Sequence, residues 1–378
     1  MERLYFDYNA SAPMAKGLTQ KLNSWLLEDY KNPNSAHAEG QKAKAVLESA
    51  RKSIGKHLNL RHHDKLIFNS GGTEGNNTVI NTARLQNPQK NVLVLTRVEH
   101  SCVYNYAQML AARGVELRFI DVTRDGEIDL AAYEKLLDEN VFLVSVMLAQ
   151  NETGFIFPVK QLAKLAQAKG ILFHSDVVCA MGKMPVDFQD LDIDFLTFSS
   201  HKFGALKGTG GLVVRGDVKC LPYVLGGTQE MEKRAGTQNV IGVASSAYAL
   251  EQHLQDLAVD VPNFIAFRAQ LKKTIQELYP QSVFIESKNH LPQTLSVAFV
   301  GLSGNLLLTS LDLEGVAVSY GSACASGSLE ISRTMRELGL PIAESRSVLR
   351  ISFGSGTTQS HIDQFGQRLQ TVLQRMTT

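Results

Sequence analysis

The most informative part of this chain reads Phe195-Leu196-Thr197-Phe198-Ser199-Ser200-His201-Lys202-Phe203-Gly204 and continues to Lys207-Gly208-Thr209-Gly210-Gly211. Its apolar run predicts a strand, and two serines, a histidine and a lysine follow where that strand ends. Hydroxyl groups and a cation at a strand end suit an anion, and a part-buried lysine beside other cations can become an amine nucleophile. We interpret Lys202 as a Schiff-base lysine for pyridoxal phosphate, with Ser199 and His201 at the phosphate. The alternative is a surface turn with one basic residue.

Length and composition indicate a globular protein with a large core. The chain has 378 residues, of which 44% are hydrophobic and 20% are charged, and its net charge is +1. This length predicts two domains, and the balanced charge argues against nucleic acid or a membrane surface as a partner. The N-terminus lacks an apolar signal segment, and no apolar run approaches the ~20 residues of a membrane span. We therefore expect a cytoplasmic protein.

Cysteine spacing argues against a metal centre. None of the four cysteines forms a CxxC pair, so we expect neither a zinc site nor a disulfide framework; they are Cys102, Cys179, Cys220 and Cys324.

Short apolar runs alternate with helical segments from residue 66 onward, after expected helices at 15–29 and 36–57. Several of these runs are apolar throughout, which suits strands covered on both faces. The alternation predicts an α/β fold with a seven-stranded, mostly parallel, doubly wound sheet and a site at the carboxyl ends of its strands. The expected strands are 66–68, 92–95, 117–120, 141–146, 171–174, 195–198 and 211–214.

The pattern changes after two expected helices at 239–257 and 262–279, with a hinge at Val261-Pro262-Asn263. Strands near 283–286, 294–300, 316–319 and 348–353 mix with helices near 304–313, 329–338 and 359–375. This predicts a smaller α+β domain. We expect residues 15–258 to form the large, cofactor-binding domain, and residues 1–14 with 259–378 to form the small one, which carries a mobile cysteine loop.

The segment Asn69-Ser70-Gly71-Gly72-Thr73-Glu74 follows the first strand and opens a helix. The adjacent glycines let backbone amides approach a ligand, and Thr73 adds a hydroxyl at the helix N-terminus, so we interpret it as an anion cradle. A tight turn is the alternative. The spacing is that of neither a P-loop nor a dinucleotide-binding motif.

Polar residues follow other strands of the same sheet. Asp176 could hold a pyridine nitrogen protonated, or cap a helix. His100 could stack on a cofactor ring and move protons, or be a buried histidine with one partner. Asn151 could contact the cofactor or a substrate carboxylate, or cap a turn. Because successive strand ends carry the groups that one cofactor needs, we favour the functional interpretation.

Two further residues lie in the second half of the chain. Cys324 stands among small residues in Gly321-Ser322-Ala323-Cys324-Ala325-Ser326-Gly327, which predicts a mobile loop with a reactive thiol rather than a packed cysteine. Arg350 interrupts an apolar strand, where its guanidinium could capture a carboxylate or form a structural ion pair.

With these residues assembled, the chain resembles the class I, NifS/IscS-like cysteine desulfurases of fold type I almost from end to end. The shared motifs are Asp7-Tyr8-Asn9-Ala10, Asn32-Pro33, Ser70-Gly71-Gly72-Thr73-Glu74, Glu99-His100, Asn151-Glu152-Thr153-Gly154, Asp176, Ser199-Ser200-His201-Lys202, Arg234-Ala235-Gly236-Thr237, Gly321-Ser322-Ala323-Cys324 and Arg350-Ile351-Ser352.

The resemblance implies a homodimer that binds pyridoxal 5'-phosphate through Lys202. It implies Asp176 on the pyridine nitrogen and His100 on the ring. Further implied roles are phosphate contacts from Gly72, Thr73, Ser199 and His201, a contact from Thr237 to the neighbouring subunit's phosphate, and substrate contacts from Asn32, Asn151 and Arg350.

The implied reaction converts L-cysteine to L-alanine. Lys202 and His100 transfer protons, the Cys324 thiolate takes the sulfur as a persulfide, and the loop delivers it to an acceptor protein. The acceptor could serve iron–sulfur cluster assembly or thiolation, and the sequence leaves it open.

One position departs from the family pattern. Cys179 stands where the family has a glutamine that bonds the cofactor's phenolate oxygen, and a thiol is the weaker donor, so we expect an altered Schiff-base titration. The alternative functions are a selenocysteine lyase or another β-lyase, an aminotransferase, and a non-enzymatic scaffold of the same fold.

Overall fold

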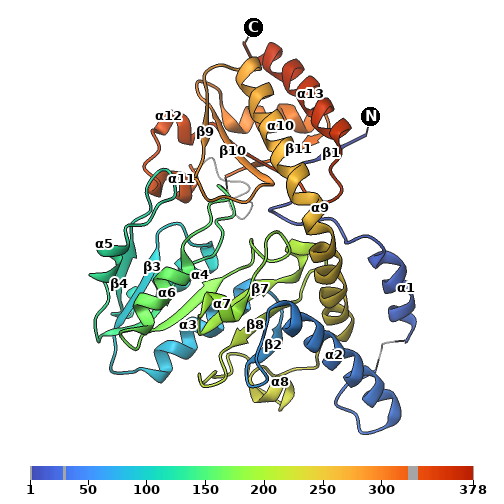
Figure 1. The fold of residues 1–378 in the computed structure, drawn as a ribbon, viewed down its shortest axis with the longest axis vertical. Helices are drawn as coiled ribbons and strands as arrows, with labels where there is room; N and C mark the ends of the chain where they lie inside the picture. Colours follow the sequence, from blue (N-terminus) through green and yellow to red (C-terminus); the bar gives the residue numbers. More distant parts are fainter. Residues whose placement is uncertain (1, 29–30, 322–330, 378) are drawn as a thin grey trace.

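The computed structural model describes residues 2–28, 31–321 and 331–377. At its centre is a seven-stranded sheet in the order β2-β8-β7-β6-β5-β3-β4 (Figure 1). Four neighbouring pairs are parallel, whereas β8 runs antiparallel to both β2 and β7. The seven expected strands are therefore all present, and the predicted α/β fold is confirmed. The strands are β2 (Lys65–Asn69), β3 (Val92–Thr96), β4 (Glu116–Ile120), β5 (Val141–Ser145), β6 (Leu172–Asp176), β7 (Phe195–Ser199) and β8 (Gly210–Val214).

Helices cover both faces of this sheet because its strands are apolar on both sides. Within β3, Leu93 and Leu95 belong to one buried cluster and Val92 and Val94 to another, as expected for side chains that alternate between the faces. The first cluster packs against α3 (Gly72–Gln86) and α4 (Ser101–Ala111). The second packs against α1 (Leu18–Glu28), α2 (Ala38–His57), α5 (Leu130–Glu134), α6 (Val159–Gln167), α7 (Phe188–Leu191) and the first half of α9.

A second, smaller lobe contains a four-stranded antiparallel sheet in the order β12-β13-β10-β9. The N-terminal strand β1 (Leu4–Tyr5) joins this lobe by pairing in parallel with β11 (Val316–Ala317). Leu4 and Phe6 lie in the buried cluster of the small lobe. Its other elements are β9 (Ser282–Ile285), β10 (Thr294–Phe299), α10 (Gly304–Leu313), β12 (Ser319–Tyr320), α11 (Arg333–Glu337), α12 (Ile342–Ser345), β13 (Val348–Ser352) and α13 (Gln359–Thr377).

The expected hinge at residues 261–263 is wrong. One helix, α9 (Val240–Leu278), includes Pro262 and passes from the large lobe into the small one (Figure 1). Proline removes one helical hydrogen bond and disfavours the helix by about 3 kcal/mol. The helix continues because its first half packs Val243 and Leu250 into the large lobe and its second half packs Phe264 and Leu271 into the small one. The expected domain boundary after residue 258 therefore falls inside a helix and stays a prediction.

Two shorter helices differ from expectation. The described part of the expected helix 329–338 is α11, which covers Arg333–Glu337 only, and α12 follows Pro341 without having been predicted. Across the described ranges, none of the helices has the length and apolar character that crossing a membrane requires.

Candidate active site

A cavity of about 250 Å³ lies at the carboxyl ends of the large sheet's strands. It brings together nine of the predicted site residues, so the expected convergence of strand ends is present in the fold; their individual roles stay predictions. These residues are Gly72, Thr73, His100, Asn151, Asp176, Cys179, Ser199, His201 and Lys202, and the lining is completed by Ala10, Asn76, Cys102, Met147 and Val178.

One end of the cavity has the features of an anion site. Helix α3 begins at Gly72, and within the described chain no side chain caps its N-terminus, so its first amides remain available to a ligand. Gly71 adopts φ 142°, and a Cβ at Gly72 would lie 2.8 Å from Val178 Cγ2, so neither position accommodates a larger residue easily. Ser199 and His201 line the same cavity. This matches the predicted cradle better than a simple turn does.

The His201 imidazole is neutral at physiological pH. Burial, followed by the nearby ammonium groups of Lys202, Lys207 and Lys183, lowers the pKa of His201 to about 4. Its Nδ1 lies 3.2 Å from Ser11 Oγ on the N-terminal segment. A neutral histidine can still donate one hydrogen bond to an anion.

Lys202 is held in place by Asn9. Its Nζ donates a 2.6 Å hydrogen bond to the backbone carbonyl of Asn9, which is completely buried. The Asn9 side chain accepts a 2.7 Å bond from Lys183 Nζ and donates to Thr294 Oγ1 at 2.9 Å and to the Asn151 carbonyl at 3.3 Å. Asn9 therefore joins two lysines, the N-terminal segment and the Asn151 loop.

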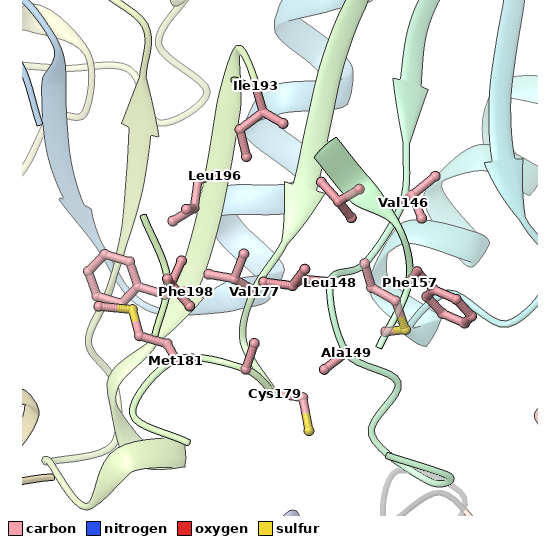
Figure 2. Packing of buried hydrophobic residues seen from close by; sticks show 14 of the residues in the cluster. Val146, Leu148, Ala149, Phe157, Val177, Cys179, Met181, Ile193, Leu196 and Phe198 are labelled. Atoms are coloured by element: carbon pink, nitrogen blue, oxygen red, sulfur yellow. The ribbon is translucent and has the colours of Figure 1, made fainter. Parts of the chain in front are cut away.

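Lys183 is a buried amine next to Cys179. Its Nζ lies 3.8 Å from Cys179 Sγ, and burial is the main cause that lowers the pKa of Lys183. Figure 2 shows Cys179 at the margin of a buried cluster, with its sulfur pointing away from Val177 and Leu148. Cys179 is only 3% exposed; it belongs to this buried cluster and also lines the cavity.

Asp176 is buried but well provided with donors. Its Oδ1 accepts from the Val178 amide at 2.8 Å and its Oδ2 from Asn76 Nδ2 at 2.6 Å. Burial is the main cause that raises the pKa of Asp176, whereas these hydrogen bonds and the charge of Lys202 act in the opposite direction. In the described chain no helix begins at this aspartate, so the helix-cap alternative is not supported. A protonated ring nitrogen beside it would favour the carboxylate.

His100 combines the N-cap of α4 with a place in the cavity. The Cys102 amide donates to His100 Nδ1 at 3.2 Å, so Nδ1 is an acceptor and the neutral ring carries its proton on Nε2. Cys102 Sγ lies 3.0 Å from the same nitrogen and accepts from Asn76 Nδ2 at 3.1 Å. Asn76 thus connects the aspartate to the Cys102–His100 pair.

Arg350 fits the alternative of a structural ion pair. It is 2% exposed and donates to Asp7 Oδ1 at 2.7 Å, to Ser319 Oγ at 2.9 Å and to the Asn151 carbonyl at 2.9 Å. Its Nε has no partner among the described residues. Capture of a substrate carboxylate by this side chain would therefore require it to exchange Asp7.

Two other predicted residues do not line this cavity. Asn32 and Thr237 are exposed, and their segments meet through a 2.9 Å bond from Asn34 Nδ2 to Gln238 Oε1. Neither residue lines the cavity of its own chain. Cys324 lies outside the described residues.

Sequence reasoning missed Asn9, Asn76, Cys102 and Lys183. Asn9 stood within a quoted motif, and Cys102 follows His100 by two positions, so both were near a signal. Asn76 lies on α3 and Lys183 lies in the turn after β6, and only their contacts identify them.

Comparisons with known proteins agree along the whole chain. The family model described as aminotransferase class-V matches residues 4–365. The cysteine desulfurase NifS of Azotobacter vinelandii is 36% identical over 364 residues, which are 96% of this chain and 90% of that protein. The cysteine desulfurase IscS of Dictyoglomus turgidum is 34% identical, with 99% of this chain and 95% of that protein covered.

Solved structures give the same picture. A NifS-like protein aligns with a TM-score of 0.93 at 30% identity over 99% of this chain and 100% of its own. SspA in complex with cysteine aligns with a TM-score of 0.81 at 28% identity over 94% of this chain and 100% of its own.

Proposed function

The chain belongs to the aminotransferase class-V family and is a cysteine desulfurase, and on this premise we propose that Lys202, Asp176 and His100 form its catalytic centre. The observation that carries the proposal is their meeting in one cavity at the carboxyl ends of the strands. The family is pyridoxal phosphate-dependent, and L-cysteine is the substrate that the relatives' names indicate.

The residues present suit pyridoxal 5'-phosphate. The uncapped end of α3 with Thr73, Ser199 and His201 would hold the phosphate, and Asp176 would face the ring nitrogen. Asn76 Oδ1 is buried without a partner among the described residues, which suits a site that a ligand completes. When bound, the cofactor supplies an electron sink that makes the substrate's Cα proton acidic.

Lys202 and His100 would transfer the protons. The Asn9 carbonyl holds the Lys202 amine at the end of β7, from where it can take the Cα proton and return it. His100 carries a proton on Nε2, so it is set to donate rather than to accept. The low pKa of His201 keeps that ring neutral and leaves the proton transfers to the other two residues.

Sulfur transfer would use Cys324. Its thiolate attacks the substrate sulfur, the carbon–sulfur bond breaks, and a sulfur–sulfur bond forms as a persulfide. The electron pair of the broken bond remains with the carbon skeleton, which takes up a proton and leaves as alanine. The persulfide then passes its outer sulfur to an acceptor protein of iron–sulfur assembly or thiolation.

We further propose a homodimer in the cytoplasm. Asn32 and Thr237 lie together on an exposed surface away from their own cavity, which suits contacts to a neighbouring subunit's site. The described cysteines, Cys102, Cys179 and Cys220, are all free thiols, which suits a reducing compartment.

The test is a sulfide assay with L-cysteine and a reductant, combined with mass spectrometry of the protein. We expect a persulfide on Cys324 and loss of nearly all activity in Cys324→Ala. Cys220→Ala is the matched control, because Cys220 is buried in the cluster under α3 and α4, and it should retain activity. A selenocysteine lyase would keep its activity on selenocysteine without Cys324. An inactive Lys202→Ala variant whose visible absorption is unchanged from the wild type would contradict the proposal that Lys202 binds the cofactor.

A further inference from the structure

A second internal space lies against Lys202, separate from the cofactor cavity. It measures about 20 Å³, and Lys202 is the one described residue that lines both spaces. The N-terminal segment contributes Tyr8 to it, α9 contributes His253 and Asp260, and the turn after β6 contributes Lys183. The space therefore lies where the two lobes meet.

Polar atoms in this space lack partners. Gln293 is 1% exposed, yet neither Oε1 nor Nε2 of its amide has a hydrogen-bond partner among the described residues, and the same holds for His253 Nε2. An unpaired buried polar atom costs about 1–3 kcal/mol, so such groups in folded proteins usually bind ordered water. The Gln293 amide alone can offer a water both a donor and an acceptor.

The size of the space fits this explanation. A cavity needs roughly 10–15 Å³ to hold one water, and that water needs two to four polar partners. The 20 Å³ available suits one water, and Gln293, His253, Lys183 and Lys202 line the space around it. An apolar void would stay dry; the walls here include Leu257, Phe264 and Phe353, but also the polar groups that a water could bind.

The same space leads toward solvent. Its lining includes Ser355, which is exposed, and Asp260, which is half-buried, while Gln293 and Lys183 are buried. We propose that a water bound by Gln293 exchanges protons between Lys202 and the solvent, on the side of the lysine away from the cofactor.

This role rests on the proposed function of Lys202. The amine takes one proton from the substrate's Cα and becomes an ammonium. The bound water takes one proton from this ammonium as it gives one to the solvent, and it later returns a proton to Lys202 as it takes one back from the solvent, so charge and atoms balance. The titratable groups that face this water are Tyr8, Lys183, Lys202, His253 and Asp260. Burial and the charge of Lys183 lower the pKa of His253 while Asp260 and Asp256 raise it, and burial raises the pKa of Tyr8. Both side chains are therefore neutral at physiological pH.

The experiment follows an isotope rather than a rate. Holoenzyme in ordinary water converts L-cysteine that carries deuterium at Cα, and mass spectrometry measures how much deuterium remains in the alanine. In the wild type, exchange at Lys202 should remove most of the label. In Gln293→Leu, which fills the space with an apolar group, we expect the retained fraction to rise several-fold.

Two variants serve as comparisons. Gln293→Glu keeps a polar group at the water and should stay near the wild type. Ser296→Ala removes another buried, unpartnered polar atom on β10, three positions after Gln293 and outside the lining of the space, and should not change retention. The visible absorption and the unfolding temperature of each variant establish that it is folded and loaded.

Equal retention in the wild type, Gln293→Leu and Ser296→Ala would overturn the proposal. So would a crystal structure of the wild-type holoenzyme, at a resolution that shows internal waters, with this space dry. If no enzyme forms alanine, the proposed function fails instead, so the two failures are distinguishable.

Discussion

Replacing Asn9 with alanine should destabilise the protein, because Asn9 is a buried residue whose hydrogen bonds hold several parts of the active site together. The side chain accepts from Lys183 Nζ at 2.7 Å and donates to Thr294 Oγ1 at 2.9 Å and to the Asn151 carbonyl at 3.3 Å. A bond to a charged group contributes about 1.5–3 kcal/mol and a neutral one about 0.5–1.5 kcal/mol. We therefore expect Asn9→Ala to lower the free energy of unfolding by about 3–5 kcal/mol.

The loss of stability in Asn9→Ala should depend on Lys183, because most of it arises from the Lys183 amine, which stays buried without an oxygen acceptor. Lys183→Met replaces the amine with an apolar chain of similar length and leaves Asn9 Oδ1 unpaired. The double variant leaves neither group unpaired, so its loss should be smaller than the sum of the single losses by about 2 kcal/mol.

Urea unfolding of the four holoenzymes, followed by circular dichroism, measures this double-mutant cycle. With a slope of about 3 kcal/mol per molar urea, a loss of 3 kcal/mol lowers the midpoint by about 1 M. Thr309→Ala, which removes an exposed hydroxyl that bonds the Asn305 carbonyl within α10, is the control and should stay near the wild type. Losses at Asn9 and Lys183 that add within about 0.5 kcal/mol would refute the reasoning, because they would show that the two side chains do not depend on each other.

Three further predictions concern the cavity and its surroundings. Burial raises the pKa of Glu99 to about 8 in the folded protein, above its value in the unfolded chain. The protonated side chain therefore contributes its full stabilisation below the unfolded pKa, and this contribution is lost as the pH rises through 8. Glu99→Gln should therefore lose less stability than the wild type between pH 5 and about 9 in thermal unfolding, and parallel curves would contradict this. Cys179→Gln should shift the pH titration of the cofactor's visible absorption and change the rate; if both stay the same, the thiol has no effect on the cofactor. Gly72→Ala should weaken cofactor binding in a fluorescence titration by about tenfold or more, because its Cβ would meet Val178 Cγ2 at 2.8 Å. Adding Val178→Ala should restore part of the affinity, and no recovery would argue against this clash.

Much of the fold and part of the site could be predicted from local patterns. Short apolar runs and the turn residues after them located all seven strands of the large sheet. Polar residues directly after those strands had to meet at one edge, because parallel strands end on the same side. The positions of Gly72, Asp176 and Lys202 followed from this rule.

Long-range contacts could not be predicted in this way. Pro262 indicated a break, but burial of both halves of α9 against two lobes outweighs the lost hydrogen bond. Arg350 was expected to be available for a carboxylate, whereas Asp7, which is 343 positions away, already pairs with it. In both cases a distant partner, absent from the local sequence, decides the outcome.

The amino-acid sequence by itself determined the order of strands and helices and the chemical groups at the strand ends, since these depend on periodicity and neighbouring residues. Only the tertiary structure decided which groups form hydrogen bonds or ion pairs with each other. Asn9 accepts hydrogen bonds from Lys202, which is 193 positions away in the sequence, and from Lys183, which is 174 positions away. No local sequence pattern predicts these two partners. The physical reason is that one hydrogen bond contributes only about 1 kcal/mol, so its partners are selected by the packing of the whole fold rather than by the bond itself.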